Sequence, residues 1–138
     1  MTGYDENRIP QILKNSKTVA VVGISDKPDR DSYRVAKYLK SVGYEILPVN
    51  PALENWDGQP VYKNLGSLPG GKHVDIVDVF RKPEAALEVV QDAVKIKPGT
   101  IWLQEGVVNK EAADLAKKSG SFVVMDRCMM KEHRKSLD

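Results

Sequence analysis

The sequence predicts an α/β domain in which helices cover both faces of a mostly parallel sheet of five strands. Short apolar, β-branched runs are bounded by Gly, Pro or polar residues, as buried parallel strands are. Segments of helical period separate these runs, and such alternation indicates right-handed crossovers in a single three-layer domain. We expect the domain to span residues 1–138, with the strands ordered 3-2-1-4-5 in the sheet. The strands are expected at residues 18–22, 45–49, 74–79, 100–103 and 121–125.

Helical periodicity is clearest after the first strand. Apolar residues recur at i, i+4 and i+7 within residues 35–42, and Asp31 or Ser32 is available as the N-cap. The irregular segment 51–72 is expected to be a surface loop with a short helical turn. Further helices are expected at residues 10–15, 86–94 and 112–116 and after residue 128.

Composition and charge exclude several classes of function. The net charge is +2, and Lys and Arg are interleaved with Asp and Glu, which argues against a nucleic-acid partner. The longest apolar run, residues 19–24, is far shorter than the roughly 20 residues of a membrane span, and the polar N-terminus shows no signal peptide. One cysteine, Cys128, excludes an internal disulfide, and His73 and His133 lack companions for a metal site. We expect a cytoplasmic protein without bound metal.

The expected topology locates the binding site before any motif is considered. In an open parallel sheet, ligands bind beyond the carboxyl ends of the strands, where the strand order reverses. This rule selects the peptides that follow the five strands, which are residues 23–25, 50–51, 80–83, 104–106 and 126–128.

The turn after the first strand differs from the glycine-rich fingerprint of dinucleotide-binding Rossmann domains. Gly23, Ser25 and Pro28 stand where that fingerprint has three glycines, so only the first, which permits the tight turn, is present. The turn still predicts an anion site. A helix N-terminus, the Arg30 guanidinium and the Ser32 hydroxyl follow it, and all three suit phosphate.

The end of the second strand argues against NAD as the ligand. NAD enzymes place an acidic residue there to bind the ribose diol. This chain has Asn50 and Pro51 at that position, so the usual ribose contact is missing. The alternative interpretation is that these two residues only form a turn.

The chain resembles a known family, the stand-alone CoA-binding domains that are similar to the N-terminal, Rossmann-like domain of the succinyl-CoA synthetase α subunit. Each motif is weak alone, but five occur in the expected order along nearly the whole chain. The segments that carry the resemblance are residues 22–32, 43–51, 78–81, 102–107 and 125–129.

The resemblance implies that coenzyme A, or a short acyl-CoA, binds at the carboxyl ends of the strands. The synthetase-like proteins carry a further domain with a phosphorylated histidine, which does not follow here, so we expect binding without catalysis. The cofactor-binding residues that it implies are Gly23, Ile24, Ser25, Pro28, Arg30, Ser32, Asn50, Pro51, Val79, Phe80, Arg81, Gln104, Glu105 and Gly106. Within this set, the first three would lie against the pyrophosphate and pantetheine, and the last three near the thiol arm.

Several of these side chains also have a purely structural interpretation. Arg81 either binds phosphate or caps a neighbouring strand, and Arg30 either binds phosphate or is a solvated loop charge. Phe80 either stacks on adenine or belongs to the core.

Other residues near the strand ends have less specific interpretations. Trp102 is expected in the core, and Asp75 and Asp78 are expected to be solvated at strand ends. Cys128 either packs against its neighbours or forms a mixed disulfide with the CoA thiol.

Two other function classes remain open at this stage. One is an NAD(P)-dependent oxidoreductase, which rests on fold analogy alone. The other is a CoA-sensing interaction module that docks onto an acyl-CoA enzyme. A homodimer is also possible, because the segment that holds Met125, Met129 and Met130 could pack either against a sister subunit or against its own sheet.

Overall fold

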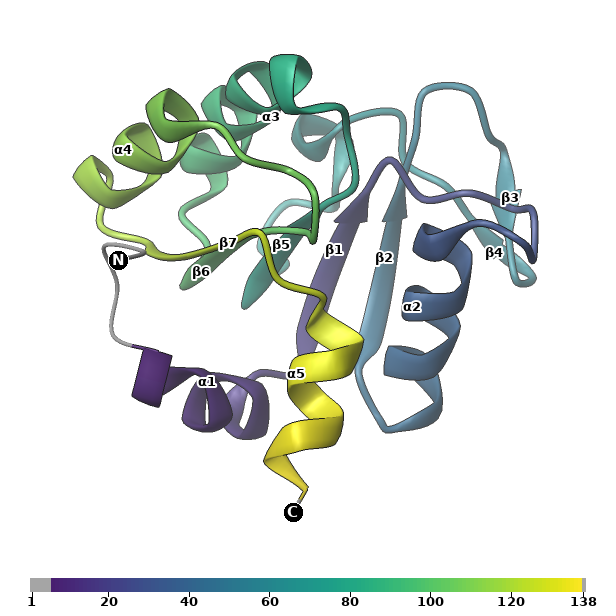
Figure 1. The fold of residues 1–138 in the computed structure, drawn as a ribbon. Helices are drawn as coiled ribbons and strands as arrows, with labels where there is room; N and C mark the ends of the chain where they lie inside the picture. The colour runs from purple at the N-terminus through teal and green to yellow at the C-terminus, as the bar shows by residue number, and fades with distance from the viewer. Residues whose placement is uncertain (1–5, 138) are drawn as a thin grey trace.

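The computed structural model describes residues 6–137. A parallel sheet of five strands forms the centre of the molecule, and helices cover both of its faces (Figure 1). The strands of this sheet are β1 (Thr18–Val22), β2 (Glu45–Val49), β5 (Ile76–Val79), β6 (Thr100–Leu103) and β7 (Phe122–Met125). The predicted Rossmann-like α/β class is therefore confirmed.

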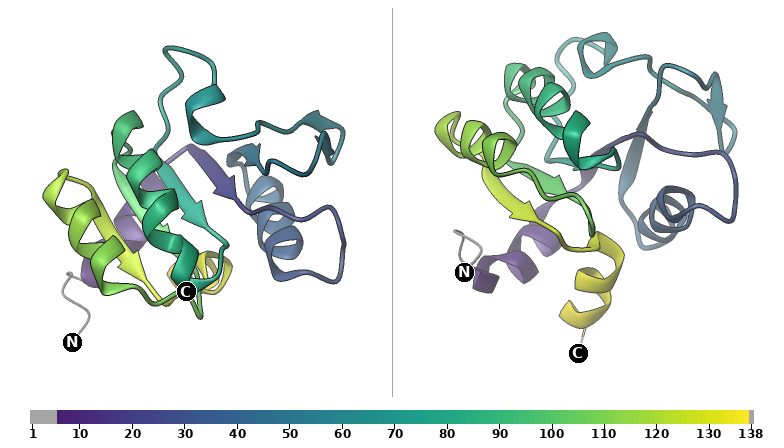
Figure 2. Two further views of the ribbon diagram at one scale, coloured as in Figure 1. Left: turned by 90° about the horizontal axis from the view of Figure 1, so that it is seen from above. Right: turned by 45° about the horizontal axis from the view of Figure 1, so that its top comes forward.

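The helices divide between the two faces of the sheet. Within residues 6–137, the α-helices are α1 (Ile9–Asn15), α2 (Asp31–Ser41), α3 (Ala86–Ala93), α4 (Lys110–Lys118) and α5 (Met129–Ser136). Short 3-10 helices are η1 (Glu6–Arg8), η2 (Leu65–Ser67), η3 (Pro83–Ala85) and η4 (Val94–Ile96). Helices α1, α2 and α5 cover one face, and α3 and α4 cover the other (Figure 2). None of the helices in this part of the chain is long and apolar enough to cross a membrane.

The predicted strand order was wrong. The observed order is β2-β1-β5-β6-β7, so the third long strand, β5, pairs with β1 and not outside β2. Pro48 in β2 has no N–H group, and proline within a sheet is confined largely to edge strands. A position at the edge of the sheet therefore suits β2. Its outer side meets the connection that follows, through the bonds from Tyr62 N to Pro48 O at 2.9 Å and from Gln59 Nε2 to Ile46 O at 3.0 Å.

The corrected order moves the topological switch point. The chain runs from β1 outward to β2 and then returns to β5 on the opposite side of β1. The expected crevice therefore lies between the carboxyl ends of β1 and β5, rather than between β1 and β6.

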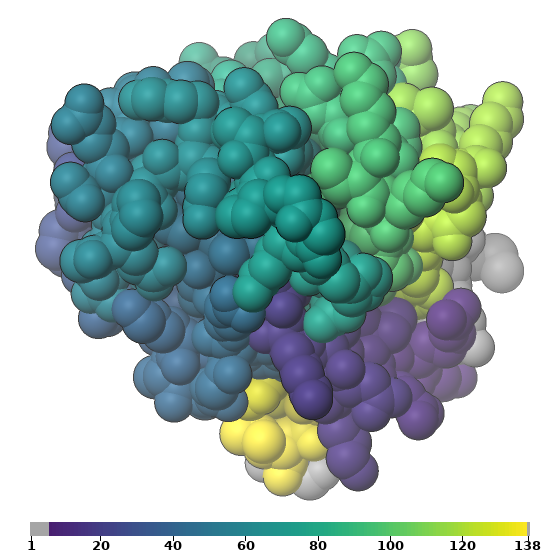
Figure 3. Space-filling model, turned by 180° about the vertical axis from the view of Figure 1, so that it is seen from behind, coloured from purple at the N-terminus to yellow at the C-terminus, as the bar shows by residue number. Residues whose placement is uncertain are grey.

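The connection from β2 to β5 is mostly irregular, as predicted, and η2 falls within the expected turn. It also contains a small antiparallel hairpin of β3 (Asn55–Trp56) and β4 (Gln59–Pro60), which was not predicted. The missed signal is the dipeptide Asp57-Gly58, whose two residues both have positive φ (50° and 78°), as the tightest hairpin turns require. Seen from behind, this connection forms a broad part of the surface, and α1 lies beside α5 (Figure 3).

Trp102 and Asp75 both lie where the sequence predicted them, in the core and at a strand end respectively. Trp102 is fully buried, and its indole Nε1 donates to the carbonyl of Arg127 at 2.8 Å, which confirms the core position. Asp75 lies at the amino end of the sheet, where it accepts hydrogen bonds from the amides of Lys17 and Thr18.

The expectation that Asp78 is solvated was wrong. It lies in a central strand, between Val21 of β1 and Trp102 of β6, and helices cover that face of the sheet. Its carboxyl group is fully buried, and neither oxygen has a hydrogen-bond partner among the described residues. Burial raises the pKa of Asp78 well above its usual value.

Candidate functional site

A cleft opens at the switch point, between the loops that leave the carboxyl ends of the strands. Its volume is about 620 Å³, within the range of small-molecule sites. The loops after β1, β2, β5 and β6 and the start of α2 form its walls. It brings together most of the predicted site residues, which are Gly23, Ile24, Ser25, Arg30, Ser32, Asn50, Phe80, Arg81, Gln104, Glu105 and Gly106.

Gly23 forms the turn at the base of the cleft. Its φ is +86°, and a Cβ atom at this position would lie 2.0 Å from the carbonyl oxygen of Phe80. Its amide donates to the carbonyl of Val49 at 2.9 Å, which holds the turn against the end of β2. Glycine is therefore required here because three strand ends converge with no room for a side chain.

A serine pair fixes the loop between β1 and α2. The amide of Ser25 donates to the Ser32 hydroxyl at 3.0 Å, and the Ser25 hydroxyl accepts from the amide of Lys27 at 3.0 Å. The prediction that Asp31 or Ser32 caps the helix was wrong, because the N-cap is Arg30 in an extended conformation. No described side chain caps α2, so the amides of its first turn remain available to an anion.

Asn50 links the loops that follow β1 and β2. Its side-chain Nδ2 donates to the carbonyl of Ile24 at 2.8 Å, and its Oδ1 accepts from the amide of Ala52 at 2.7 Å. The second bond stabilises a turn at Asn50 and Pro51, which the alternative interpretation of these residues expected. The first bond shapes the wall of the cleft, so the residue has both roles.

Positive charge predominates along the cleft. Its cationic side chains are Lys27, Arg30, Arg81 and Lys82, and none of them forms an ion pair within residues 6–137. Three carboxylates also line the cleft. Those of Asp31 and Glu105 are paired with Arg34 and Lys131, and that of Asp26 partly offsets the positive charge. Unpaired guanidinium and ammonium groups beside a helix N-terminus suit phosphate oxygens.

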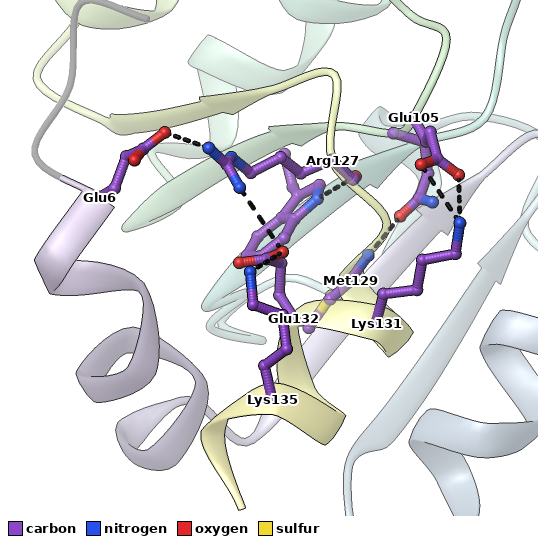
Figure 4. Close-up of polar contacts among 9 residues, drawn as sticks. Glu6, Glu105, Arg127, Met129, Lys131, Glu132 and Lys135 are labelled. Carbon is purple, nitrogen blue, oxygen red and sulfur yellow. Dashed lines mark hydrogen bonds and ion pairs between the residues drawn. The ribbon is translucent and has the colours of Figure 1, made fainter. Parts of the chain in front are cut away.

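The loop after β6 joins the cleft to the start of α5. Gln104 is buried, and its Oε1 accepts from the amide of Met129, the first residue of α5, at 3.0 Å. Glu105 accepts from Lys131 Nζ at 2.9 Å (Figure 4). The amide of Gly106 donates to Asp126 Oδ1 at 2.7 Å. These contacts fix α5 against one end of the cleft, a position that the sequence did not predict.

Further contacts hold the beginning of α5 from the other side. Arg127 pairs with Glu6 from the N-terminal segment and with Glu132 within α5 (Figure 4). Met129 is fully buried, and Met125 and Met130 pack against the core of their own chain. The methionines therefore cover their own sheet, and a homodimer stays a prediction.

Three predicted residues do not line the cleft. Val79 is fully buried in the core, and Pro28 lies on the exposed loop after β1. Pro51 lines a neighbouring hollow of about 270 Å³, to which Arg81 also contributes. Conversely, the cleft includes residues that the predicted set omitted.

Among the omitted residues, Lys27 and Lys82 were detectable from the sequence, because each is next to a predicted residue in a loop that follows a strand. Leu53 was not, because its position depends on the path of the irregular loop.

The two histidines lie outside the cleft. His73 pairs with Asp75 through Nε2 at 3.0 Å, at the amino end of the sheet. His133 on α5 shares a hydrogen bond of 2.7 Å with the hydroxyl of Tyr38, and burial lowers its pKa. Among the described residues, no group of three His, Cys, Asp or Glu side chains could hold a metal ion.

The fold and the cleft together define a Rossmann-like domain with four cationic side chains around its switch point. Residues 17–134 match the family described as the CoA binding domain, and the chain belongs to this family. The resemblance seen in the sequence is therefore confirmed.

Two relatives match the chain along almost the whole length of both proteins. YneT of Bacillus subtilis (strain 168) is 40% identical over 133 residues, which are 96% of this chain and 97% of that protein. The structure of a hypothetical protein from Pyrococcus horikoshii OT3 is 37% identical, with a TM-score of 0.93 over 100% of this chain and 96% of that one.

The chain is also similar to one part of a larger enzyme subunit. The α subunit of acetate–CoA ligase (ADP-forming) II from Pyrococcus furiosus is 28% identical over 127 residues. The match covers 83% of this chain but 27% of that subunit, so the chain corresponds to about a quarter of the relative.

Proposed function

We propose that this protein binds coenzyme A or a short acyl-CoA in the cleft between β1 and β5, without catalysing a reaction itself. The observation that carries the proposal is the set of four unpaired cations around the uncapped start of α2, in a member of the CoA-binding domain family. Coenzyme A carries phosphates at its nucleotide end, and these are the groups that such a surface attracts.

Each part of the cleft has a distinct task in this proposal. The backbone at Gly23 to Ser25 lets the pyrophosphate approach closely, and the amides at the start of α2 donate to it. Arg30 and Arg81 supply charge from two sides of the cleft. Gln104 and Glu105 lie at the end where the resemblance places the thiol arm.

The paired side chains of the cleft give no support to catalysis. The Ser32 hydroxyl accepts from a backbone amide, and the carboxylates of Asp31 and Glu105 are held in ion pairs. None of these groups is arranged as a nucleophile with an adjacent base, which acyl transfer requires. We therefore propose a carrier or sensor of the ligand rather than an enzyme.

Thermal unfolding with and without ligand tests the proposal. At about 100 times the dissociation constant, CoA should add about 2.7 kcal/mol to the free energy of unfolding, which raises the melting temperature by roughly 10 °C. NAD should produce no comparable shift. A shift with NAD and none with CoA would falsify the assignment.

A pair of variants locates the binding. Arg81→Gln removes one phosphate partner and should weaken CoA binding about tenfold or more, since a hydrogen bond to a charged group contributes about 1.5–3 kcal/mol. Lys118→Gln makes a similar change of charge at the exposed end of α4 and should leave the affinity unchanged. Equal affinities for the two variants would place the ligand elsewhere.

A further inference from the structure

A second hollow lies beside the cleft on its α5 side. It lies between α2 and the start of α5 and has a volume of about 380 Å³. Four residues line both spaces, so the two share part of their walls: Asp31, Phe80, Gln104 and Glu105. This space is called here the α2–α5 hollow. The phosphate site proposed above does not use it.

Four apolar side chains form part of the wall of the α2–α5 hollow, and charged or polar side chains form the rest. Val35 of α2 and Cys128 are buried, and Phe80 and Met130 are partly buried around the same space. An apolar group that enters here leaves water and gains contact with these side chains.

The charged residues at the hollow are already paired with one another. Arg34 forms an ion pair with Asp31, and Lys131 Nζ lies 2.9 Å from Glu105 Oε1. A ligand carboxylate would therefore meet two carboxylates of the protein and would have to break an ion pair to gain a cation. The pairing favours an uncharged ligand group.

The wall that α5 contributes is held in place. The bonds from the Met129 amide to Gln104 and from Lys131 to Glu105 join this helix to the loop after β6 (Figure 4). The start of α5 is therefore joined to the loop that forms the shared wall.

We infer that the α2–α5 hollow receives the acyl group of a short-chain, uncharged acyl-CoA. This inference rests on the proposed function, in which the thiol end of the ligand lies at Gln104 and Glu105. From there, the acyl group of a thioester continues past Phe80 to the side chains of Val35, Cys128 and Met130, while free CoA leaves that part of the hollow to water. The protein then discriminates acyl-CoA from CoA without reacting with either.

Calorimetric titration with CoA, acetyl-CoA, propionyl-CoA, butyryl-CoA and succinyl-CoA tests the inference. Each buried methylene should tighten binding about fourfold, so butyryl-CoA should bind at least about tenfold more tightly than CoA. Succinyl-CoA has a similar length but carries a carboxylate, and it should bind no more tightly than CoA.

The outcomes separate this inference from the proposed function. If CoA binds and the acyl series shows no gain with length, the hollow is not an acyl site, although the CoA site stands. Tighter binding of succinyl-CoA than of butyryl-CoA also overturns the inference. If neither CoA nor any acyl-CoA binds, the proposed function itself is wrong.

A substitution inside the hollow provides a second test. Met130→Trp fills the space, and the ratio of the CoA to the butyryl-CoA dissociation constant should fall close to one. Leu137→Trp adds the same side chain at the end of the same helix, where residue 137 is 70% exposed, and should keep the ratio of the parent protein. An unchanged ratio in Met130→Trp contradicts the inference, and the acyl series on the parent protein decides it independently of how that variant folds.

Discussion

The carbonyl oxygen of Phe80 occupies the position that a side chain on Gly23 would need. A Cβ atom at residue 23 would lie 2.0 Å from this oxygen, far inside contact distance. The amide of Phe80 also donates to the carbonyl of Val22 at 2.8 Å, so the ends of β1 and β5 are joined beside the cleft. This convergence follows from the strand order and sets the shape of the proposed site.

Gly23→Ala should therefore destabilise the protein for two reasons. Alanine is strained at a positive φ, and its Cβ atom would also clash with the carbonyl oxygen of Phe80. Gly120→Ala is the matched control, because Gly120 has φ +98° but no atom within 4 Å of the added Cβ. We expect about 1–2 kcal/mol for the control and about 2 kcal/mol or more in addition for Gly23→Ala. Urea unfolding of the two variants measures the difference, and equal losses would contradict the close approach.

Asn50→Asp should disturb the wall of the cleft by removing one hydrogen-bond donor, the Nδ2 group of residue 50. The change replaces the Nδ2 donor to the carbonyl of Ile24 by a carboxylate oxygen, which repels that carbonyl. We expect a loss of about 1–3 kcal/mol in the free energy of unfolding, together with weaker CoA binding. Asn55→Asp introduces the same charge on the exposed side of β3 and should change neither quantity appreciably. Full CoA affinity in Asn50→Asp would show that the wall of the cleft does not depend on this bond.

Gln104→Met should loosen the start of α5. The substitution keeps the length of the side chain but removes the acceptor for the buried amide of Met129. Hydrogen exchange at the start of α5 should become faster, because an unpaired buried amide costs about 1–3 kcal/mol. Gln91→Met, on the exposed face of α3, is the control and should leave hydrogen exchange at the start of α5 unchanged. Slow exchange in Gln104→Met would mean that other contacts suffice to hold the helix.

Two aspartates should contribute to stability with opposite dependence on pH. Burial raises the pKa of Asp78 above 3.8, so the folded state holds this proton more tightly than the unfolded state. Stability therefore falls as the pH rises from about 3.8 through the folded-state pKa. Asp78→Asn should be more stable than the parent at pH 7, and its advantage should shrink as the pH falls toward 4.

Asp57 supplies the comparison of opposite sign. Hydrogen bonds from Lys40 and Lys37 lower its pKa below 3.8, so its contribution is present above that pH and is lost as the pH falls through the folded-state value. Asp57→Asn should be less stable than the parent at pH 7, with a difference that disappears in acid. Urea unfolding between pH 3 and pH 8 measures the stability of both variants relative to the parent. The same pH dependence in both would contradict the opposite pKa shifts of the two aspartates.

The sequence predicted the elements of the fold better than their arrangement. Apolar runs and helical periodicity are local properties, and they located the five strands of the main sheet and the segments that form the helices. The order of the strands depends on contacts between distant segments. Pro48 was the local sign that β2 lies at an edge of the sheet. Proline has no N–H group, so it cannot donate a hydrogen bond to a strand on the outer side of β2.

The candidate site shows the same division. Residues that follow the strand ends, such as Gly23, Arg81 and Gln104, could be assigned to the cleft from topology alone. Val79 could not be separated from them by position, since only the structure shows that its side chain turns into the core. The wall formed by α5 was not predicted because it depends on tertiary bonds such as that of Gln104 with the Met129 amide.

Backbone amide NMR during a titration with CoA tests the central claim most directly. The account predicts shift changes at residues 23–25, at the start of α2 and at residues 80–82. It predicts none at a separate hollow of about 470 Å³ at the amino end of the sheet, which Arg8, Asn15 and Phe122 line. Changes centred on that hollow, or none at the ends of β1 and β5, would contradict it.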